Sequence, residues 1–375
     1  MNDNRPSSYQ YYNQLINWVG DKNKFFNGEF VWPKQFEIHL PSNHKRHCNL
    51  NCSHCQGKNY QRDLGHWEMD CLDLLNKLKG EIPFQIYGGA YSEPLMNPYL
   101  MTFLSTTKKY NNHFGIHTNG ILLKELEDNY GFLTELHRIS TDKVDYLSIS
   151  LDGGLPWNWA KTKGTKKEEF FYQTVSGIKK ACSIRDKSEK ESHAIRIAYL
   201  LSPEVDSENE ILSVVSIAKD LKVDSLRFSI PYAPYNQNFD KVRQYEKQKH
   251  IFEQGEKYKK IISNFLSFKC TDMPYIFYVS PYTTSVQQCT CQHCIYGYFQ
   301  ITYGADGGVY KCSSVAAPDA SQCRLGDATS NIDKFKEMIM KNYNKDFSPE
   351  KNCFSKGLRC NRMALEINHE YDKKN

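Results

Sequence analysis

His44-Lys-Arg-His-Cys48-Asn-Leu-Asn-Cys52-Ser-His-Cys55-Gln-Gly-Lys-Asn-Tyr60 is the stretch around which this chain is organised. Its three cysteines have the spacing Cys-x3-Cys-x2-Cys. Three thiolates from one short loop can hold three irons of a [4Fe–4S] cube, whereas a fully protein-ligated cube uses four cysteines. The loop therefore predicts an iron–sulfur centre with one iron left open to a small molecule.

Zinc is the alternative occupant of this loop. Structural zinc sites favour paired Cys-x2-Cys units and a fourth ligand. The x3 gap between Cys48 and Cys52 fits neither habit well, so the spacing favours iron and sulfide.

The segment Cys48-Asn-Leu-Asn-Cys52-Ser-His54-Cys55 resembles the cluster loop of radical S-adenosylmethionine (SAM) enzymes. His54 stands where that family usually has an aromatic residue. The resemblance implies that Cys48, Cys52 and Cys55 form the catalytic centre and bind a [4Fe–4S] cluster, whose open iron holds SAM. It also implies reductive cleavage of SAM to a 5′-deoxyadenosyl radical, which abstracts hydrogen from a substrate; the cofactor carries the chemistry.

Composition limits the class of protein and its partners. The 375 residues include 48 Lys and Arg against 43 Asp and Glu, a mild excess that does not indicate a nucleic-acid platform. The first eight residues are polar, and no run approaches the length of a membrane span. We therefore expect a cytoplasmic protein without a nucleic-acid or membrane partner. Thirteen cysteines in such a chain argue for metal or redox use.

Strand-like and helix-like patterns alternate along the first two thirds of the chain. Strands are expected at 35–40, 83–87, 113–117, 145–151, 194–201 and 225–230, with helices near 67–79, 97–110, 122–139, 165–184 and 207–221. This alternation predicts an α/β fold with a parallel sheet, either an open doubly wound sheet or a curved partial barrel. Sites in such folds collect at the carboxyl ends of the strands.

The resemblance selects the second architecture: a partial (β/α)6 TIM-like barrel with a smaller C-terminal iron–sulfur domain. It implies four segments along the chain. They are an N-terminal cap (1–34), the radical SAM partial barrel (35–232), a helical bridge (233–267) and a Twitch/SPASM-like auxiliary-cluster domain (268–375).

A glycine-rich turn follows the second expected strand and reads Tyr87-Gly-Gly-Ala-Tyr-Ser-Glu-Pro94. Glycine lets a ligand approach the backbone closely, although an ordinary turn has the same composition. The segment is similar to the Gly-Gly-Glu-Pro motif of the family, which contacts the amino group of the methionine moiety, but three residues separate the second glycine from the glutamate. The resemblance assigns cofactor binding to Gly88, Gly89, Ala90, Ser92 and Glu93.

Four further cofactor contacts are expected at later strand ends. Asn119 lies in a Thr-Asn-Gly sequence that is also a turn signal, and Ser150 matches a family serine that lines the SAM crevice. Lys163-Gly164 stands where many relatives have an Arg-Gly that pairs with the methionine carboxylate; a solvated helix face is the alternative for this lysine. Arg196, on an apolar strand, is either a carboxylate ligand or part of a structural ion pair.

A second group of cysteines follows residue 265. Alternating residues 298–303, the Asp306-Gly-Gly308 turn and Val309-Tyr310 predict a hairpin that brings Cys312 beside Cys294. Cys353 and Cys360 can complete a four-cysteine cage for a second [4Fe–4S] cluster. The spacing resembles the Twitch and SPASM extensions of the family, and a zinc ribbon is the alternative. Four cysteines remain, and they are Cys270, Cys289, Cys291 and Cys323. They can exchange roles with the four above, hold a further cluster, or donate hydrogen to a substrate radical.

The resemblance implies an oxidoreductase or maturase. Its expected substrate is a peptide or protein side chain that becomes crosslinked, epimerised or oxidised, and its electrons would come from an external donor such as flavodoxin or ferredoxin. One alternative is a radical SAM dehydrogenase or epimerase of a small metabolite such as a carbohydrate. The other is a non-enzymatic iron–sulfur or zinc binding module.

Overall fold

The computed structural model describes residues 19–42, 47–55, 67–89, 92–201, 207–231, 241–266, 273–279, 292–294, 296–318, 320–342 and 347–353. The chain divides into two compact units. One, here the β4–β7 unit, takes its described residues from 49–55 and 116–279. The other, the β1–β8 unit, takes them from 19–48, 67–115 and 292–353.

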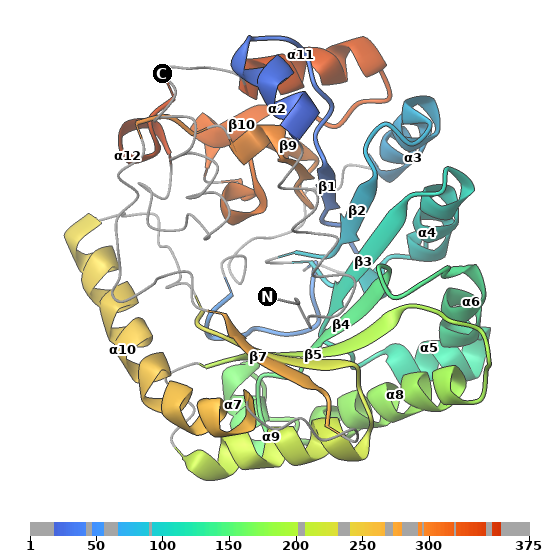
Figure 1. Ribbon diagram of the computed structural model, residues 1–375, viewed down its shortest axis with the longest axis vertical. Helices are drawn as coiled ribbons and strands as arrows, with labels where there is room; N and C mark the ends of the chain where they lie inside the picture. Colours follow the sequence, from blue (N-terminus) through green and yellow to red (C-terminus); the bar gives the residue numbers. More distant parts are fainter. Residues whose placement is uncertain are drawn as a thin grey trace. The chain divides into compact units, whose positions relative to one another are not determined.

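In the β4–β7 unit, four parallel strands pair in chain order: β4 (Tyr146–Ser150), β5 (Ala194–Leu200), β6 (Ser225–Ser229) and β7 (Tyr275–Val279). Nearly every residue of β4 and β5 is buried, as expected for parallel strands covered on both faces. Figure 1 shows α8 (Glu169–Asp186) and α9 (Glu208–Asp220) on one side of these strands. The unit also contains α5 (Leu123–Tyr130), α6 (Phe132–Ile139), α7 (Pro156–Thr162) and α10 (Lys241–Leu266).

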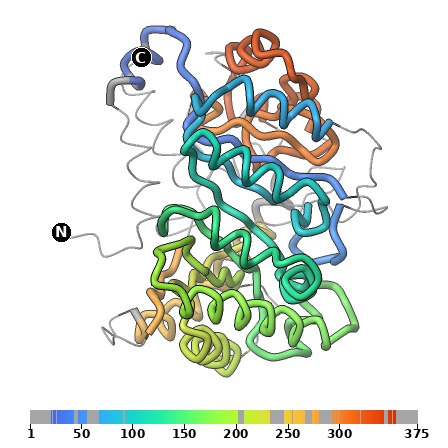
Figure 2. Tube along the Cα trace, turned by 90° about the vertical axis from the view of Figure 1, so that its right-hand side faces the viewer, coloured from blue at the N-terminus to red at the C-terminus, as the bar shows by residue number. Residues whose placement is uncertain are grey.

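In the β1–β8 unit, strand β1 (Gln35–Ile38) lies between two parallel neighbours, β2 (Phe84–Tyr87) and β8 (Gln300–Tyr303). Strand β8 continues through a hairpin to β9 (Gly308–Tyr310), which pairs antiparallel with β10 (Arg324–Asp327). Helices α3 (Glu68–Leu78) and α4 (Leu100–Lys109) run side by side, as Figure 2 shows. The unit also contains α2 (Val19–Phe26), α11 (Ile332–Asn342) and α12 (Pro349–Asn352), and β3 (His113–Thr118) runs from this unit into the other along the chain.

Aromatic side chains hold β1 and β8 together. The Phe36 and Tyr303 rings meet edge to face with centroids 4.8 Å apart, and Phe335 of α11 lies 5.6 Å from Phe36 and 6.0 Å from Tyr303. All three side chains are fully buried. Such rings contribute large apolar areas and favour these offset geometries, so the pairing of the two distant segments has its own core.

The α/β class expected from the sequence is confirmed, and each of the six expected strands is present. β7 was not expected, and the hairpin arm β8 was expected without its parallel partner β1. The domain limits at residues 34, 232 and 267 stay predictions, although the β8–β1 pairing joins the segment after residue 268 to the first expected strand.

None of the described helices is both long enough and apolar enough to span a bilayer. The longest of them, α10, has 26 residues and carries lysines and glutamates throughout. Its length alone would suffice for a span, but its charge excludes it.

Candidate active site

The cysteine loop of the β4–β7 unit is fastened to the end of helix α7. The Asn51 N–H donates to the Lys163 carbonyl (3.2 Å), and the Ser53 N–H donates to the Thr162 carbonyl (3.0 Å). The last carbonyls of a helix have no partner within the helix, and here N–H groups of the loop donate hydrogen bonds to them. Gly164 follows with φ +64°, and a Cβ at this position would lie 1.9 Å from the Asn51 carbonyl oxygen. Only glycine allows the two segments to approach so closely.

Asn119 holds the start of the same loop. Its side-chain amide donates to Asn49 Oδ1 (2.8 Å), while its own Oδ1 accepts the Ile121 N–H (3.0 Å). Thr174 of α8 donates from Oγ1 to the Asn119 carbonyl (3.3 Å). Asn119 therefore connects the end of β3 with the cysteine loop, and its contact with SAM stays a prediction.

None of the three loop cysteines is in a disulfide, and each is partly exposed. The Cys55 N–H donates to the Cys52 carbonyl (3.1 Å), which makes a tight turn between these two ligands. Desolvation raises the pKa of the Cys52 thiol to about 12; the Lys163 ammonium opposes this rise and Cys55 adds to it. A thiol in such surroundings keeps its proton until a metal cation takes its place. The donor set, all sulfur, suits iron–sulfur ligation.

A buried ion pair lies behind the loop. Lys163 Nζ donates to Asp152 Oδ2 at 2.6 Å, and the two side chains are 2% and 1% exposed. Asp152 has φ +46°, and its Oδ1 accepts the Leu200 N–H at 2.7 Å. The structure thus places the lysine ammonium against a carboxylate of this chain. The pairing of Lys163 with the SAM carboxylate stays a prediction.

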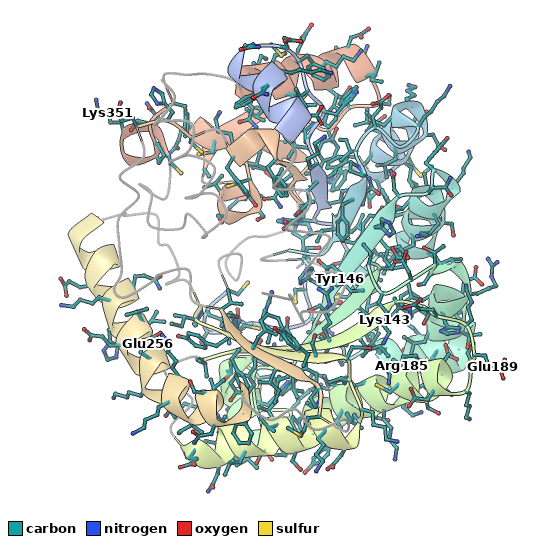
Figure 3. The ribbon with its side chains drawn as sticks, in the orientation of Figure 1. Lys143, Tyr146, Arg185, Glu189, Glu256 and Lys351 are labelled. Atoms are coloured by element: carbon teal, nitrogen blue, oxygen red, sulfur yellow. The ribbon has the colours of Figure 1, made fainter. Side chains whose placement is uncertain are left out.

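Arg196 and Ser150 lie on adjacent strands of the same unit. The Arg196 side chain is buried, and its guanidinium carbon lies 3.8 Å from the centroid of the Tyr146 ring, a cation–π geometry. Tyr146, labelled in Figure 3, pairs through its hydroxyl with His117 Nε2 (2.9 Å). Ser150 is the last residue of β4 and is partly exposed. Their roles in SAM binding stay predictions.

The glycine-rich turn lies in the β1–β8 unit, directly after β2. Gly88 has φ +100°, and its N–H donates to the Ile38 carbonyl (3.1 Å). Gly89 and Ser92 form an antiparallel bridge, closed by the Ser92 N–H donating to the Gly89 carbonyl (3.2 Å). A Cβ on Gly89 would lie 1.8 Å from His39 Nε2, so the imidazole occupies the space a side chain would need.

Two side chains of this motif bind the neighbouring backbone. Ser92 Oγ donates to the Leu40 carbonyl, and Glu93 Oε1 accepts the Leu95 N–H (3.1 Å) at the start of a short 3-10 helix, Pro94–Met96. The Glu93 N–H donates to the carbonyl of His47, the residue before Cys48 (2.8 Å). The motif is thereby tied to the start of the cysteine loop. Ala90, also expected to bind the cofactor, lies outside the described residues.

The expected C-terminal hairpin is present, and it brings cysteines together. A buried cluster of Val315, Ala320, Cys323 and Phe347 packs against Cys294, Cys312 and Cys353. Desolvation raises the pKa of the Cys312 thiol, and Cys353 and Cys294 raise it further. Three of the four expected ligands are thus neighbours, together with a cysteine outside that set. Cys360 lies outside the described residues, as do Cys270, Cys289 and Cys291.

A buried polar chain runs from the glycine-rich turn to the C-terminal cysteines. His39 Nε2 pairs with Glu37 Oε1 (2.7 Å), and Gln300 Nε2 donates to Glu37 Oε2 (2.6 Å). Ser313 Oγ, next to Cys312, donates to Gln300 Oε1 (3.4 Å). Sequence reasoning missed this chain and also missed Asp152; the signal in both cases was a polar residue at or near the end of an apolar strand.

Solved structures resemble this chain in fold. No family model and no curated protein sequence matches the chain. Among solved structures, Streptococcus suis SuiB matches with a TM-score of 0.50 and 13% identity over 81% of this chain and 64% of that one. SuiB bound to S-adenosylmethionine matches with a TM-score of 0.50 and 14% identity, over 83% and 67%.

The structure of SuiB bound to its precursor peptide SuiA matches over 93% of this chain and 74% of SuiB, with a TM-score of 0.50 and 14% identity. This chain shares its α/β fold with SuiB. The α/β fold that the cysteine-loop resemblance implied is thereby confirmed. The chain spans just under two thirds of the first of these SuiB chains.

This α/β fold explains where the site residues of the β4–β7 unit lie. Ser150 ends β4, Asp152 follows it, and Leu200, which binds Asp152, ends β5. In parallel α/β folds these carboxyl ends carry the site. Lys163 reaches the same edge from α7.

Proposed function

We propose that this chain is a radical SAM enzyme that reductively cleaves S-adenosylmethionine and abstracts hydrogen from a peptide or protein side chain, leading to a crosslink, an epimerised centre or an oxidised residue. The observation that carries the proposal is the three-cysteine loop, without a disulfide, that is fastened to the end of α7 at the strand ends of an α/β fold shared with SuiB.

The residues present fit an iron–sulfur cofactor at this loop. Cys48, Cys52 and Cys55 would hold the cluster, because three thiolates leave one iron open. When bound, the cluster supplies the single electron that breaks a carbon–sulfur bond of SAM and so releases the 5′-deoxyadenosyl radical. Desolvation raises the pKa of the Cys52 thiol, so a metal that binds there must displace its proton.

The chain itself orients the cofactor and keeps its surroundings fixed. Gly88 and Gly89 present main-chain groups without side chains, which suits an approach by the amine of SAM. His39 fills the space beside Gly89 and limits the freedom of that turn. The Lys163–Asp152 pair fixes the end of α7 and with it the carbonyls that hold the cysteine loop. Such preorganisation keeps reacting groups close and aligned.

A peptide substrate is supported by SuiB, whose structure with the precursor peptide SuiA has the same fold over 93% of this chain. At 14% identity this likeness concerns the fold, so the substrate class rests on analogy. We further propose an auxiliary cluster at the C-terminal cysteines, a flavodoxin or ferredoxin as electron donor, and action in the cytoplasm.

The first test measures SAM cleavage. The full chain is purified without oxygen, reconstituted with iron and sulfide and incubated with SAM and dithionite, and 5′-deoxyadenosine is quantified by mass spectrometry. The wild-type protein is expected to form 5′-deoxyadenosine, and Cys52→Ala is expected to form at least about 100-fold less of it. Cys182→Ala, which removes a buried thiol in α8, is the matched control. Deoxyadenosine formation by Cys52→Ala, or zinc bound without sulfide, would refute the proposal.

The second test concerns the substrate. Extracts of host cells with and without the protein are compared by mass spectrometry for peptides that lose two hydrogens, gain a crosslink or take up solvent deuterium. A modified peptide supports the proposed substrate class. A carbohydrate or another small metabolite as the sole modified species would replace it while leaving SAM cleavage intact.

A further inference from the structure

Four cysteines of the β1–β8 unit lie around one buried lysine. Lys311 is 7% exposed and directly precedes Cys312, and the buried cluster that contains Cys323 and Phe347 packs against Cys294, Cys312 and Cys353. Its Nζ donates to Asn342 Oδ1 (2.9 Å) and lies 4.3 Å from the centroid of the Phe347 ring. A buried cation needs partners, because desolvation of an uncompensated charge is costly.

Main-chain hydrogen bonds fix three of these cysteines, each in a different segment. The Lys311 N–H donates to the Cys323 carbonyl (3.2 Å), which places β9 against the 3-10 turn Ser321–Cys323. The Cys294 N–H donates to the Phe347 carbonyl (3.0 Å). Cys312 accepts the Val315 N–H (3.2 Å), so it starts the 3-10 turn Ser313–Val315. The backbone thus fixes Cys294, Cys312 and Cys323, and Cys353 packs against the same buried cluster.

Asn342 belongs to the same arrangement. It lies at the end of α11, and a Cβ on Gly297 would come within 1.8 Å of its Nδ2. The absence of a side chain at Gly297 lets the amide lie beside the cysteine cluster, where its oxygen accepts from Lys311. The chain therefore builds a polar cradle for this one cation inside an otherwise apolar cluster.

The chemistry of the set points to a thiolate-bound iron centre. None of these four cysteines is in a disulfide, and four thiolates saturate a [4Fe–4S] cube. Four thiolates and a cube together carry net negative charge, which a buried ammonium offsets. Cys323 is fully buried inside the cluster, which fits a ligand better than a surface thiol.

We propose that Cys294, Cys312, Cys323 and Cys353 are the four protein ligands of an auxiliary [4Fe–4S] cluster, with Lys311 as a positioning residue that raises its reduction potential. The proposal deepens the proposed function, since it names the ligands of the second cluster. It replaces Cys360 by Cys323 in the set expected from spacing.

The test isolates this site by using the full chain with Cys48, Cys52 and Cys55 all changed to alanine. We expect about four irons and four sulfides per chain in this background after anaerobic reconstitution, as one cube requires. Adding Cys323→Ala is expected to remove the absorption and electron paramagnetic resonance signals of the four-iron cluster. If circular dichroism shows that alanine impairs folding, Cys323→Ser is used in its place. Adding Cys360→Ala is expected to leave them unchanged.

The opposite pattern, with iron lost in Cys360→Ala and kept in a folded Cys323 variant, would overturn the ligand set. Zinc without sulfide would overturn the cluster itself. Because this background lacks the loop cysteines, its result is independent of SAM cleavage. An intact auxiliary cluster in a wild-type chain that makes no deoxyadenosine would refute the proposed function alone.

Lys311 is tested by a redox titration of the same background, followed by electron paramagnetic resonance. Lys311→Met keeps the length of the side chain and removes its charge, so the midpoint potential is expected to become more negative. Lys311→Arg is expected to return it toward the parent value. A purely structural lysine would change cluster occupancy without moving the potential, and an unchanged potential in a fully loaded Lys311→Met protein would refute the role.

Discussion

Lys163 Nζ lies 2.6 Å from Asp152 Oδ2, and neither side chain is more than 2% exposed. The pair joins the end of β4 to the end of α7, whose last carbonyls hold the cysteine loop. Asp152 also accepts the Leu200 N–H from the end of β5. One buried contact therefore fixes two strand ends and the segment that carries Cys52.

Lys163→Met is expected to destabilise the folded chain by about 3–5 kcal/mol, because it leaves the Asp152 carboxylate buried without its cation. Urea unfolding of the metal-free protein measures this change. The matched control is Lys124→Met, which removes the lysine of an exposed pair with Asp128 and should cost about 1 kcal/mol or less. Equal losses in the two variants would show that the buried pair contributes no more than a surface pair.

Gly164→Ala should displace the cysteine loop. Gly164 and Gly131 have nearly the same backbone conformation, with φ +64° and +65°, so alanine adds similar strain of about 1 kcal/mol at each. A Cβ at Gly164 meets the Asn51 carbonyl oxygen at 1.9 Å, whereas a Cβ at Gly131 has no neighbour within 4 Å among the described residues. We expect Gly164→Ala to lose the irons of the loop cluster and Gly131→Ala to keep them, as iron and sulfide analysis would show. Full iron in Gly164→Ala would contradict the fastening of this loop.

Gly89→Ala is expected to weaken SAM binding about tenfold or more, measured by equilibrium dialysis of the reconstituted protein. The added methyl group would overlap His39 Nε2, so the turn must move. The double variant Gly89→Ala with His39→Ala removes the overlap and should recover part of the affinity. If a folded double variant recovers no affinity for SAM, the overlap between the new methyl group and His39 is not the cause of the weaker binding.

Stability should fall in mild acid because of His193. Burial, followed by the proximity of His137, lowers the pKa of this histidine from 6.5 to about 4. Its Nδ1 lies 3.2 Å from Ser140 Oγ. The unfolded chain therefore binds a proton near pH 6.5 that the folded chain binds only near pH 4. About 3 kcal/mol of stability, full above pH 6.5, is lost as the pH falls to about 4.

Chemical unfolding between pH 7.5 and pH 4 measures this slope. His193→Gln should flatten it, whereas His250→Gln, on an exposed position of α10, should not. A wild-type stability that stays constant over this range would contradict the assignment.

Local pattern was sufficient to predict the strands that follow one another with intervening helices. β5 is a mostly apolar run that only Arg196 interrupts, and the Asp306-Gly-Gly308 turn predicted the β8–β9 hairpin. The parallel pairing of β8 with β1 joins residues more than 260 positions apart, and no local pattern encodes such a partner. β7 was missed, although Tyr275–Val279 is a run of aromatic and β-branched residues of the kind that favours a strand.

The site residues divide in the same way, into those that a local pattern predicts and those that only the fold brings together. Cys48, Cys52 and Cys55 could be proposed as ligands because their spacing is a property of a single loop. Asp152 could not be recognised as the partner of Lys163, since ten residues and a helix separate them. Cys323 has no motif spacing to the other cysteines, and only the folded turns bring it to them.

The place of β1 between β2 and β8 has a consequence for biosynthesis. When β1 leaves the ribosome, the segment that completes its hydrogen bonding on one side has not yet been translated. At about 5–20 residues per second, the delay until Tyr303 emerges is on the order of 10 to 50 s. During that interval one edge of β1 is open to other chains, and a molecular chaperone that shields it should raise the yield of native protein.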